Sequence, residues 1–158
     1  MRAVAPWVVV LWIVALLAGP AWAQDAPVAQ DSAALTVTVV HASKAGETMD
    51  PKLARIAKYL TKSLKPYTAF KQLDEQGKTV KRGATASFLL PNGSKLELQL
   101  MAPDPKRQGF VKLHLTLDSL KTTVNVKDGG LFFQAGRVHE GGILVLAISA
   151  RTAKGGAR

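Results

Sequence analysis

Apolar and polar residues alternate strictly along residues 111–118, and this period of two constrains the fold more than any other feature of the sequence. Side chains on a β-strand point alternately to opposite faces, so the pattern predicts a strand with one buried face. Similar alternation over residues 35–41 and 96–100 predicts two more strands of this half-buried kind. The chain is therefore expected to be rich in β-structure.

Turn signals divide the rest of this pattern into short strands. Strands are expected at 67–73, 79–81, 85–90, 124–126 and 131–136. Gln76-Gly77 is expected to be a turn, and Pro91-Asn92-Gly93 and Asp128-Gly129-Gly130 to be hairpin turns, because Asn and Gly tolerate positive φ. The run Ile143–Ile148 is apolar on both faces, which predicts a central strand covered on both sides.

One amphipathic helix is expected from Asp50 to Lys65. Asp50 is suited to cap its start, Pro51 fits the first helical position, and Pro66 ends it. A short helix needs its apolar stripe packed on something, and the sheet is the only candidate. The stripe consists of Leu53, Ile56, Ala57, Leu60 and Leu64. The predicted fold class is α+β, with one helix on a mainly antiparallel sheet; a sandwich and a partly closed barrel both remain open.

Residues 1–23 have the features of a cleavable signal peptide. Arg2 precedes an apolar run, and Ala21 and Ala23 form an A-x-A cleavage site. The alternative is an uncleaved anchor, since the apolar stretch is just long enough to span a bilayer, but Gly19-Pro20 favours cleavage. The rest is expected to be a flexible leader over 24–33, a single domain over 34–150 and a disordered basic tail over 151–158. The expected location is the periplasm or the outside of the cell.

Cysteine content and charge limit the classes of function. The chain has no cysteine, which excludes disulfides, thiolate metal sites and a cysteine nucleophile. It has 21 Lys and Arg against 11 Asp and Glu, a net charge of +10, and loss of Arg2 with the signal peptide would leave +9. Such a charge favours anionic partners, and it also serves solubility.

The histidines and serines form no recognised catalytic or metal-binding motif. No H-E-x-x-H or G-x-S-x-G is present, so neither a metal nor a cofactor is expected. His114 is expected on an exposed strand face, and His41 to be hydrogen-bonded at a strand edge. His139-Glu140 lies before the last strand and could act as acid and base, but catalysis requires positioned partners and a pocket.

The expected helix carries five cations and, after its cap Asp50, no acidic residue. At about 100° per residue they lie opposite the apolar stripe. Like charges at this spacing repel weakly, so a helix built for stability alone would include glutamates. The face is either simply solvated or a surface for an anionic partner; with only Tyr59 beside the cations, specific nucleic-acid binding is not expected. The five cations are Lys52, Arg55, Lys58, Lys62 and Lys65.

Several segments together carry a resemblance to other proteins. These segments are Val37–Ser43, Asp50–Leu53, Tyr67–Phe70, Leu90–Gly93 and Gly142–Ile148. With them the chain resembles a group of small exported proteins of unknown function from Gram-negative bacteria of the myxobacterial type. The resemblance implies a location in the cell envelope and assigns no functional residue.

The sequence therefore predicts a non-catalytic exported module that binds a protein partner in the cell envelope. The first alternative is a module that uses the basic helix face to bind a polyanion or a membrane surface. The second is a hydrolase-like enzyme that uses His139 and Glu140.

Overall fold

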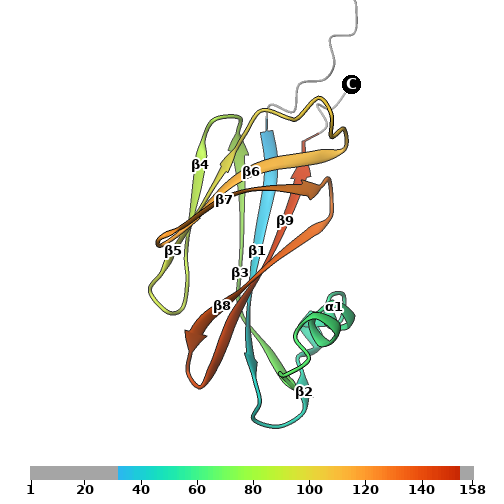
Figure 1. The fold of residues 1–158 in the computed structure, drawn as a ribbon, viewed down its shortest axis with the longest axis vertical. Helices are drawn as coiled ribbons and strands as arrows, with labels where there is room; N and C mark the ends of the chain where they lie inside the picture. Colours follow the sequence, from blue (N-terminus) through green and yellow to red (C-terminus); the bar gives the residue numbers. More distant parts are fainter. Residues whose placement is uncertain (1–31, 154–158) are drawn as a thin grey trace, which may run out of the picture.

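A computed structural model describes residues 32–153, and strands make up most of this part of the chain (Figure 1). The expectations for residues 1–31 and 154–158, which include the signal peptide and most of the leader and tail, lie outside the described residues. The elements are β1 (Ser32–Ser43), β2 (Thr48–Met49), the 3₁₀ helix η1 (Pro51–Leu53), α1 (Ala57–Ser63), β3 (Ala69–Lys81), β4 (Thr85–Leu89), β5 (Lys95–Leu100), β6 (Phe110–Leu117), β7 (Leu120–Lys127), β8 (Leu131–His139) and β9 (Gly142–Thr152).

The strands form two sheets. One has the order β2-β3-β1-β9-β8 and the other β4-β5-β6-β7, and only the short β2 runs parallel to its neighbour. The two sheets curl around a shared core. Among the described residues no ladder joins β3 to β4 or β7 to β8, so the two sheets do not form a closed barrel. The fold is thus mainly β and mainly antiparallel; the expected α+β class holds only roughly, because the helical part is small.

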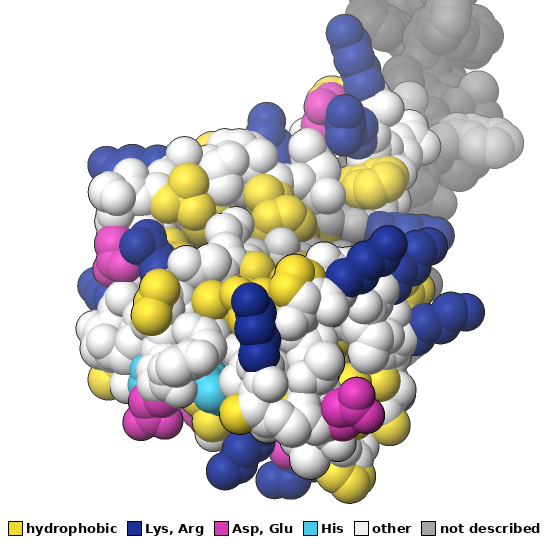
Figure 2. Space-filling model, turned by 60° about the horizontal axis from the view of Figure 1, so that its bottom comes forward, with side chains coloured by type: hydrophobic (Ala, Val, Ile, Leu, Met, Phe, Trp, Pro, Cys, Tyr) yellow, Lys and Arg dark blue, Asp and Glu magenta, His cyan; other side chains and the backbone are white. Residues whose placement is uncertain are grey.

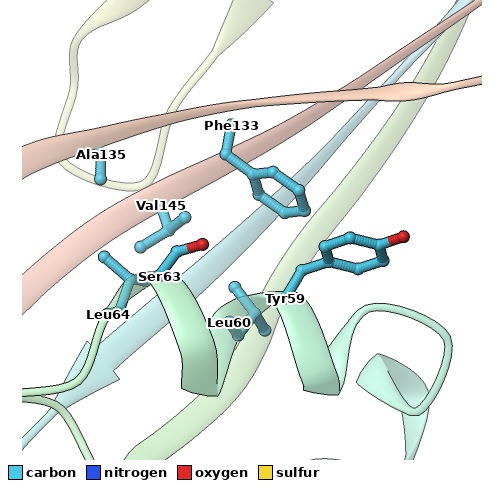
Figure 3. Close-up of a pocket in the computed structure, with 7 residues that line it drawn as sticks. All are labelled: Tyr59, Leu60, Ser63, Leu64, Phe133, Ala135 and Val145. Carbon is cyan, nitrogen blue, oxygen red and sulfur yellow. The ribbon is translucent and has the colours of Figure 1, made fainter.

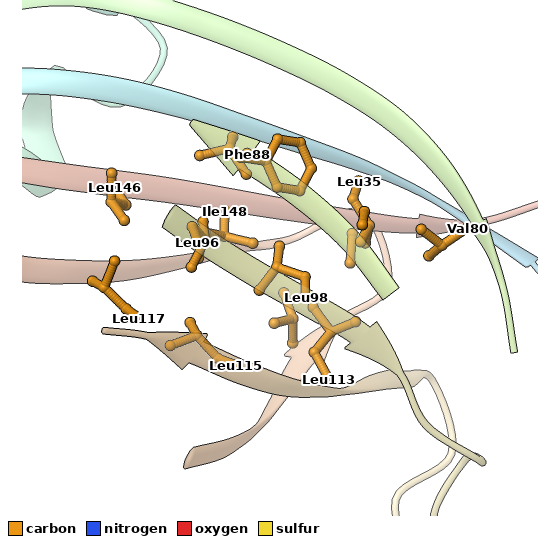
Figure 4. Packing of buried hydrophobic residues seen from close by; sticks show 14 of the residues in the cluster. Leu35, Val80, Phe88, Leu96, Leu98, Leu113, Leu115, Leu117, Leu146 and Ile148 are labelled. Carbon is orange, nitrogen blue, oxygen red and sulfur yellow. The ribbon is translucent and has the colours of Figure 1, made fainter. Parts of the chain in front are cut away.

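The main hydrophobic core lies between the two sheets (Figure 4). Leu35 of β1, Phe88 of β4 and Leu98 of β5 are each completely buried there. The buried face that the alternation predicts for β6 is confirmed. Its four apolar residues, each at most 1% exposed, are Val111, Leu113, Leu115 and Leu117. A period of two places all these apolar side chains on one face of the strand, and that face is the buried one.

The prediction for the last strand is also confirmed. β9 lies between β1 and β8, inside the five-stranded sheet. Leu146 and Ile148 face the core between the sheets, whereas Val145 and Ala147 face a second cluster beneath the helical segment. A strand covered on both sides needs apolar residues at every position, and residues 143–148 supply them.

The helical segment is shorter and less regular than predicted. Asp50 does cap its start, but the segment is a 3₁₀ turn at 51–53 followed by an α-helix at 57–63, rather than one helix to Lys65. Leu53, Ile56 and Leu60 are nevertheless buried against the sheet, as the stripe predicted. Burial of these three side chains stabilises a helical segment that is too short to be stable alone.

One expected turn is wrong, and one expected hairpin turn is instead a turn between two sheets, closed by the bond from the Gly130 N–H to the Lys127 carbonyl at 2.7 Å. Gln76-Gly77 lies inside the single long strand β3, where Gln76 and Gly77 pair with Val37 and Thr36 of β1. The glycines at 129–130 do not close a hairpin, because β7 and β8 belong to different sheets and the chain crosses between the sheets there. Pro91-Asn92-Gly93 does close the β4–β5 hairpin, with Gly93 at φ 83°.

The expected domain ends are also corrected. β1 begins at Ser32 and so includes the last residues assigned to the leader. Arg151 and Thr152 belong to β9 instead of to a disordered tail. Both ends continue because β1 and β9 pair with each other as far as Ala33 and Thr152.

Candidate functional site

The outer face of the five-stranded sheet is the face away from the main core. It changes from apolar to polar along its strands. Beneath the helical segment it is apolar, with Val40, Val145 and Ala147 buried. Further along, Thr36 of β1 lies between Gly77 of β3 and Ser149 of β9, and Ser149 lies beside Leu131 of β8. Because Thr36, Gly77 and Ser149 have small side chains or none, and no element within residues 32–153 covers them, this part of the sheet is open in the described structure.

We call the resulting hollow the cationic groove; its volume is about 430 Å³. Thr36, Thr38 and Ser149 supply hydroxyl groups from the sheet. The groove also carries three cations and one carboxylate. Its full lining is Thr36, Thr38, Lys52, Arg55, Ile56, Glu75, Gly129, Leu131, Ser149 and Arg151.

The cations of the groove come from two distant parts of the sequence. Lys52 and Arg55 belong to the helical segment, and Arg151 lies near the end of β9; all three are exposed. Within residues 32–153 none of them forms an ion pair with a carboxylate. Glu75 accepts a hydrogen bond from Thr38 Oγ1 at 3.3 Å, through its Oε2 atom. The groove therefore has an excess of positive charge, which attracts anions.

Asp50 fixes the wall that carries Lys52 and Arg55. Its Oδ1 accepts the Lys52 backbone N–H at 3.0 Å, its Oδ2 accepts the N–H of Gln72 at 3.2 Å, and its own N–H donates to the Phe70 carbonyl at 2.9 Å. The bond from Lys52 and, secondarily, that from Gln72 lower the pKa of the Asp50 carboxyl below its ordinary value. The charged carboxylate thus ties the start of the helical segment to β3.

The structure divides the five cations that the sequence grouped together. All five are exposed, as the sequence predicted for side chains on the solvent face. Only Lys52 and Arg55 line the groove. The other three, Lys58, Lys62 and Lys65, belong to α1 and the residues that follow it.

A second, smaller hollow lies between α1 and β8. Its volume is about 160 Å³ and its lining is almost entirely apolar. The rings of Tyr59 and Phe133 stack at its edge, with centroids 6.2 Å apart and planes 29° from parallel (Figure 3). Tyr59 is 59% exposed. The whole lining, which we call the apolar hollow, is Tyr59, Leu60, Ser63, Leu64, Phe133, Ala135 and Val145.

The surface around α1 is partly apolar, as in the apolar hollow, and partly basic, as in the cationic groove. Figure 2 turns the α1 end toward the viewer and shows hydrophobic side chains in the middle of this face, with Lys and Arg side chains among and around them and a few Asp and Glu side chains toward the edges. Phe133 of the apolar hollow and Leu131 of the cationic groove are two residues apart on β8, so the two hollows are neighbours on one face of that strand.

His139 and Glu140 lie at the tight hairpin between β8 and β9. Glu140 and Gly141 both have positive φ, 41° and 76°, as the commonest two-residue hairpin turn requires. His139 Nε2 is 3.8 Å from Glu140 Oε2, and His41 Nε2 is 3.0 Å from the His139 carbonyl oxygen. Neither the groove nor the apolar hollow is lined by these residues.

His41 and His114 have the surroundings that the sequence predicted. His41 is half-buried and hydrogen-bonded near the end of β1. His114 lies on the outer face of β6, with Nδ1 3.2 Å from Thr123 Oγ1. In the part of the chain that the structure describes, no three His, Asp or Glu side chains are grouped in a way that could hold a metal ion. Nor does any helix between Ser32 and Ala153 have the length and apolarity needed to cross a membrane.

No family model, curated protein or solved structure matches this chain. The resemblance to small exported bacterial proteins therefore stays a prediction.

The sequence interpretation missed Arg151 and the hydroxyl groups as parts of a site. A signal was present at the end of β9, where the positions that share a face with Val145 and Ala147 become Ser149 and Arg151. Thr36 and Thr38 give the same signal on β1, because they alternate with Leu35 and Val37. Polar residues on a face that is apolar further along indicate where the cover ends.

Proposed function

We propose that the protein is an exported, non-catalytic binding module that binds an anionic partner in the cationic groove. The observation that carries the proposal is that Lys52 and Arg55 line one hollow together with Arg151, which is far from both in the sequence. Export rests separately on the signal-peptide features of residues 1–23.

Two features of the groove support binding there over a merely solvated surface. Its volume of about 430 Å³ lies within the range of ordinary ligand sites. Arginine presents several donors in a planar fork that fits carboxylate and phosphate groups, and the groove has two arginines. Hydroxyl groups on the sheet add neutral hydrogen-bonding groups beside these charges.

The apolar hollow favours a second candidate function, which is binding of a protein partner in the cell envelope. Aromatic side chains are enriched at the centres of protein interfaces, and Tyr59 is exposed beside Phe133. This candidate uses α1 and β8, so its variants differ from those of the groove.

The proposed function is tested with a charge-reversal variant of the groove. Arg55→Glu/Arg151→Glu should weaken binding to immobilised heparin and to anionic vesicles by more than about tenfold, since each cation near an anionic surface contributes about 1 kcal/mol. Raising the salt concentration should weaken binding by the parent protein as well. Binding is measured as dissociation constants at low and at physiological salt.

The matched control is Lys112→Glu/Lys121→Glu, which makes the same change of charge on the outer face of the four-stranded sheet. It should retain most of the binding. Equal losses in the two variants would show that net charge alone attracts the probes and would contradict a specific groove. Absence of binding by the parent at low salt would contradict the proposal as a whole.

A further inference from the structure

On the basis of the proposed function, we infer that the ligand of the cationic groove is an acidic carbohydrate, a chain that carries both carboxylate or phosphate groups and free hydroxyl groups. The groove offers partners for both kinds of group. Lys52, Arg55 and Arg151 suit the anionic groups, while Glu75 and the hydroxyls of Thr36 and Ser149 suit neutral hydroxyl groups.

Glu75 is the residue that distinguishes a carbohydrate from a bare polyanion. An ionised carboxylate only accepts hydrogen bonds and repels phosphate or sulfate, so a site built for a bare polyanion gains nothing from it. Sugar hydroxyl groups donate hydrogen bonds, and a carboxylate is a strong acceptor for them. One oxygen of Glu75 accepts from Thr38, whereas its Oε1 has no hydrogen-bond partner among residues 32–153.

The shape and the polarity of the groove also fit a carbohydrate. Thr36 and Ser149 are paired neighbours on β1 and β9, so their hydroxyl groups lie side by side on the floor. Leu131 flanks Ser149 on β8 and is 42% exposed, which leaves an apolar surface for the C–H face of a sugar ring. Gly77 on the other side of Thr36 has no side chain and leaves the floor open toward β3.

The test compares three anionic probes on the purified protein: oligogalacturonate, inorganic polyphosphate and phosphatidylglycerol vesicles. Oligogalacturonate carries carboxylate and hydroxyl groups, whereas polyphosphate carries charge without hydroxyl groups. The parent protein should bind oligogalacturonate. Glu75→Gln should weaken this binding about three- to tenfold, as loss of a hydrogen bond to a charged acceptor does, and should strengthen binding of polyphosphate by removing a negative charge.

Glu97→Gln is the matched control, because it removes the same charge on the outer face of the four-stranded sheet. It should leave the affinity for oligogalacturonate unchanged. If Glu75→Gln strengthens binding of oligogalacturonate and polyphosphate alike, the carbohydrate is wrong and the anion-binding function stands. Binding to vesicles alone would replace the carbohydrate by a lipid surface, and failure of all three probes to bind the parent would contradict the proposed function itself.

Discussion

At the scale of single residues, Asp50 connects local structure to the groove. Its carboxylate accepts one N–H from the helical segment and another from β3, so a single side chain holds Lys52 at the rim of the groove. Such capping bonds satisfy donors that the first turn of a helix leaves without partners. The position of the groove wall therefore depends on the charge of one half-buried residue.

The contribution of the Asp50 charge should appear in how the free energy of unfolding changes with pH. Because the pKa of Asp50 is lowered in the folded protein, its contribution is fully present above the ordinary pKa of 3.8 and is lost as the pH falls through the lowered value. Asp50→Asn should be less stable than the parent at neutral pH, and the difference should shrink as the pH falls toward about 2. Urea unfolding midpoints across this range measure the effect.

Asp104→Asn is the control for this prediction. Asp104 also accepts the backbone N–H two residues later, at 2.9 Å from Lys106, but makes no bond to a strand in the described part. Its variant should unfold nearly as the parent does. A difference between Asp50→Asn and the parent that stays constant with pH would contradict the role of the charge.

At the scale of elements, the helical segment shows how burial overrides local preference. The segment has an apolar stripe but no favourable i,i+4 ion pairs, and it forms a regular helix only over residues 57–63. Leu53 and Leu60 reach the sheet from the 3₁₀ turn and from α1 respectively. The apolar stripe contacts the sheet even where the helix is interrupted, because this contact buries apolar side chains of both the stripe and the sheet.

A pair of substitutions on α1 tests this account. Leu60 is 1% exposed, so Leu60→Ala should lower the free energy of unfolding by about 2–5 kcal/mol. Lys58 is exposed on the same helix, and Lys58→Ala should cost less than about 0.5 kcal/mol. Chemical denaturation measures both. Similar losses in the two variants would mean that α1 does not pack on the sheet through Leu60.

At the scale of the whole molecule, the two sheets meet where β3 lies beside β4, which we call the seam. Side-chain hydrogen bonds join the two strands there, instead of a backbone ladder. Gln76 Nε2 donates to the Leu89 carbonyl at 2.9 Å, and Lys78 Nζ donates to the Ser87 carbonyl. Lys78 also lies over the ring of Phe88, 5.2 Å from its centroid. These polar side chains reach across to β4 and bind its carbonyl groups, which protects an edge that could otherwise pair with another chain.

Removal of these two side chains should loosen the β4 side of the four-stranded sheet more than its β7 side. In Gln76→Ala/Lys78→Ala, backbone amides of β4 and β5 should exchange with deuterium about threefold faster or more, because local opening no longer breaks the two bonds. Amides of β6 and β7 should change less. Lys121→Ala, a substitution on the outer face of β7, is the control. Equal acceleration in all four strands of this sheet would show that the two side chains have no local role.

The sequence by itself determined most of the strands and their buried faces. Strict alternation identified β6, and the doubly apolar run identified β9 as a central strand, because the two faces of a strand are encoded in alternate residues. The sequence also identified the capping role of Asp50, the buried stripe and the exposure of the five cations. These features depend on near neighbours in the chain, and so local rules suffice for them.

The tertiary structure alone decided how the strands were joined and which cations meet. Gln76-Gly77 resembles a turn, yet it continues as strand because β1 supplies a ladder partner from forty residues earlier in the chain. Lys52, Arg55 and Arg151 share a groove because the helical segment packs on the sheet only a short way from the end of β9. Pairing and packing between distant segments depend on the whole set of contacts, so no local pattern in the sequence specifies them.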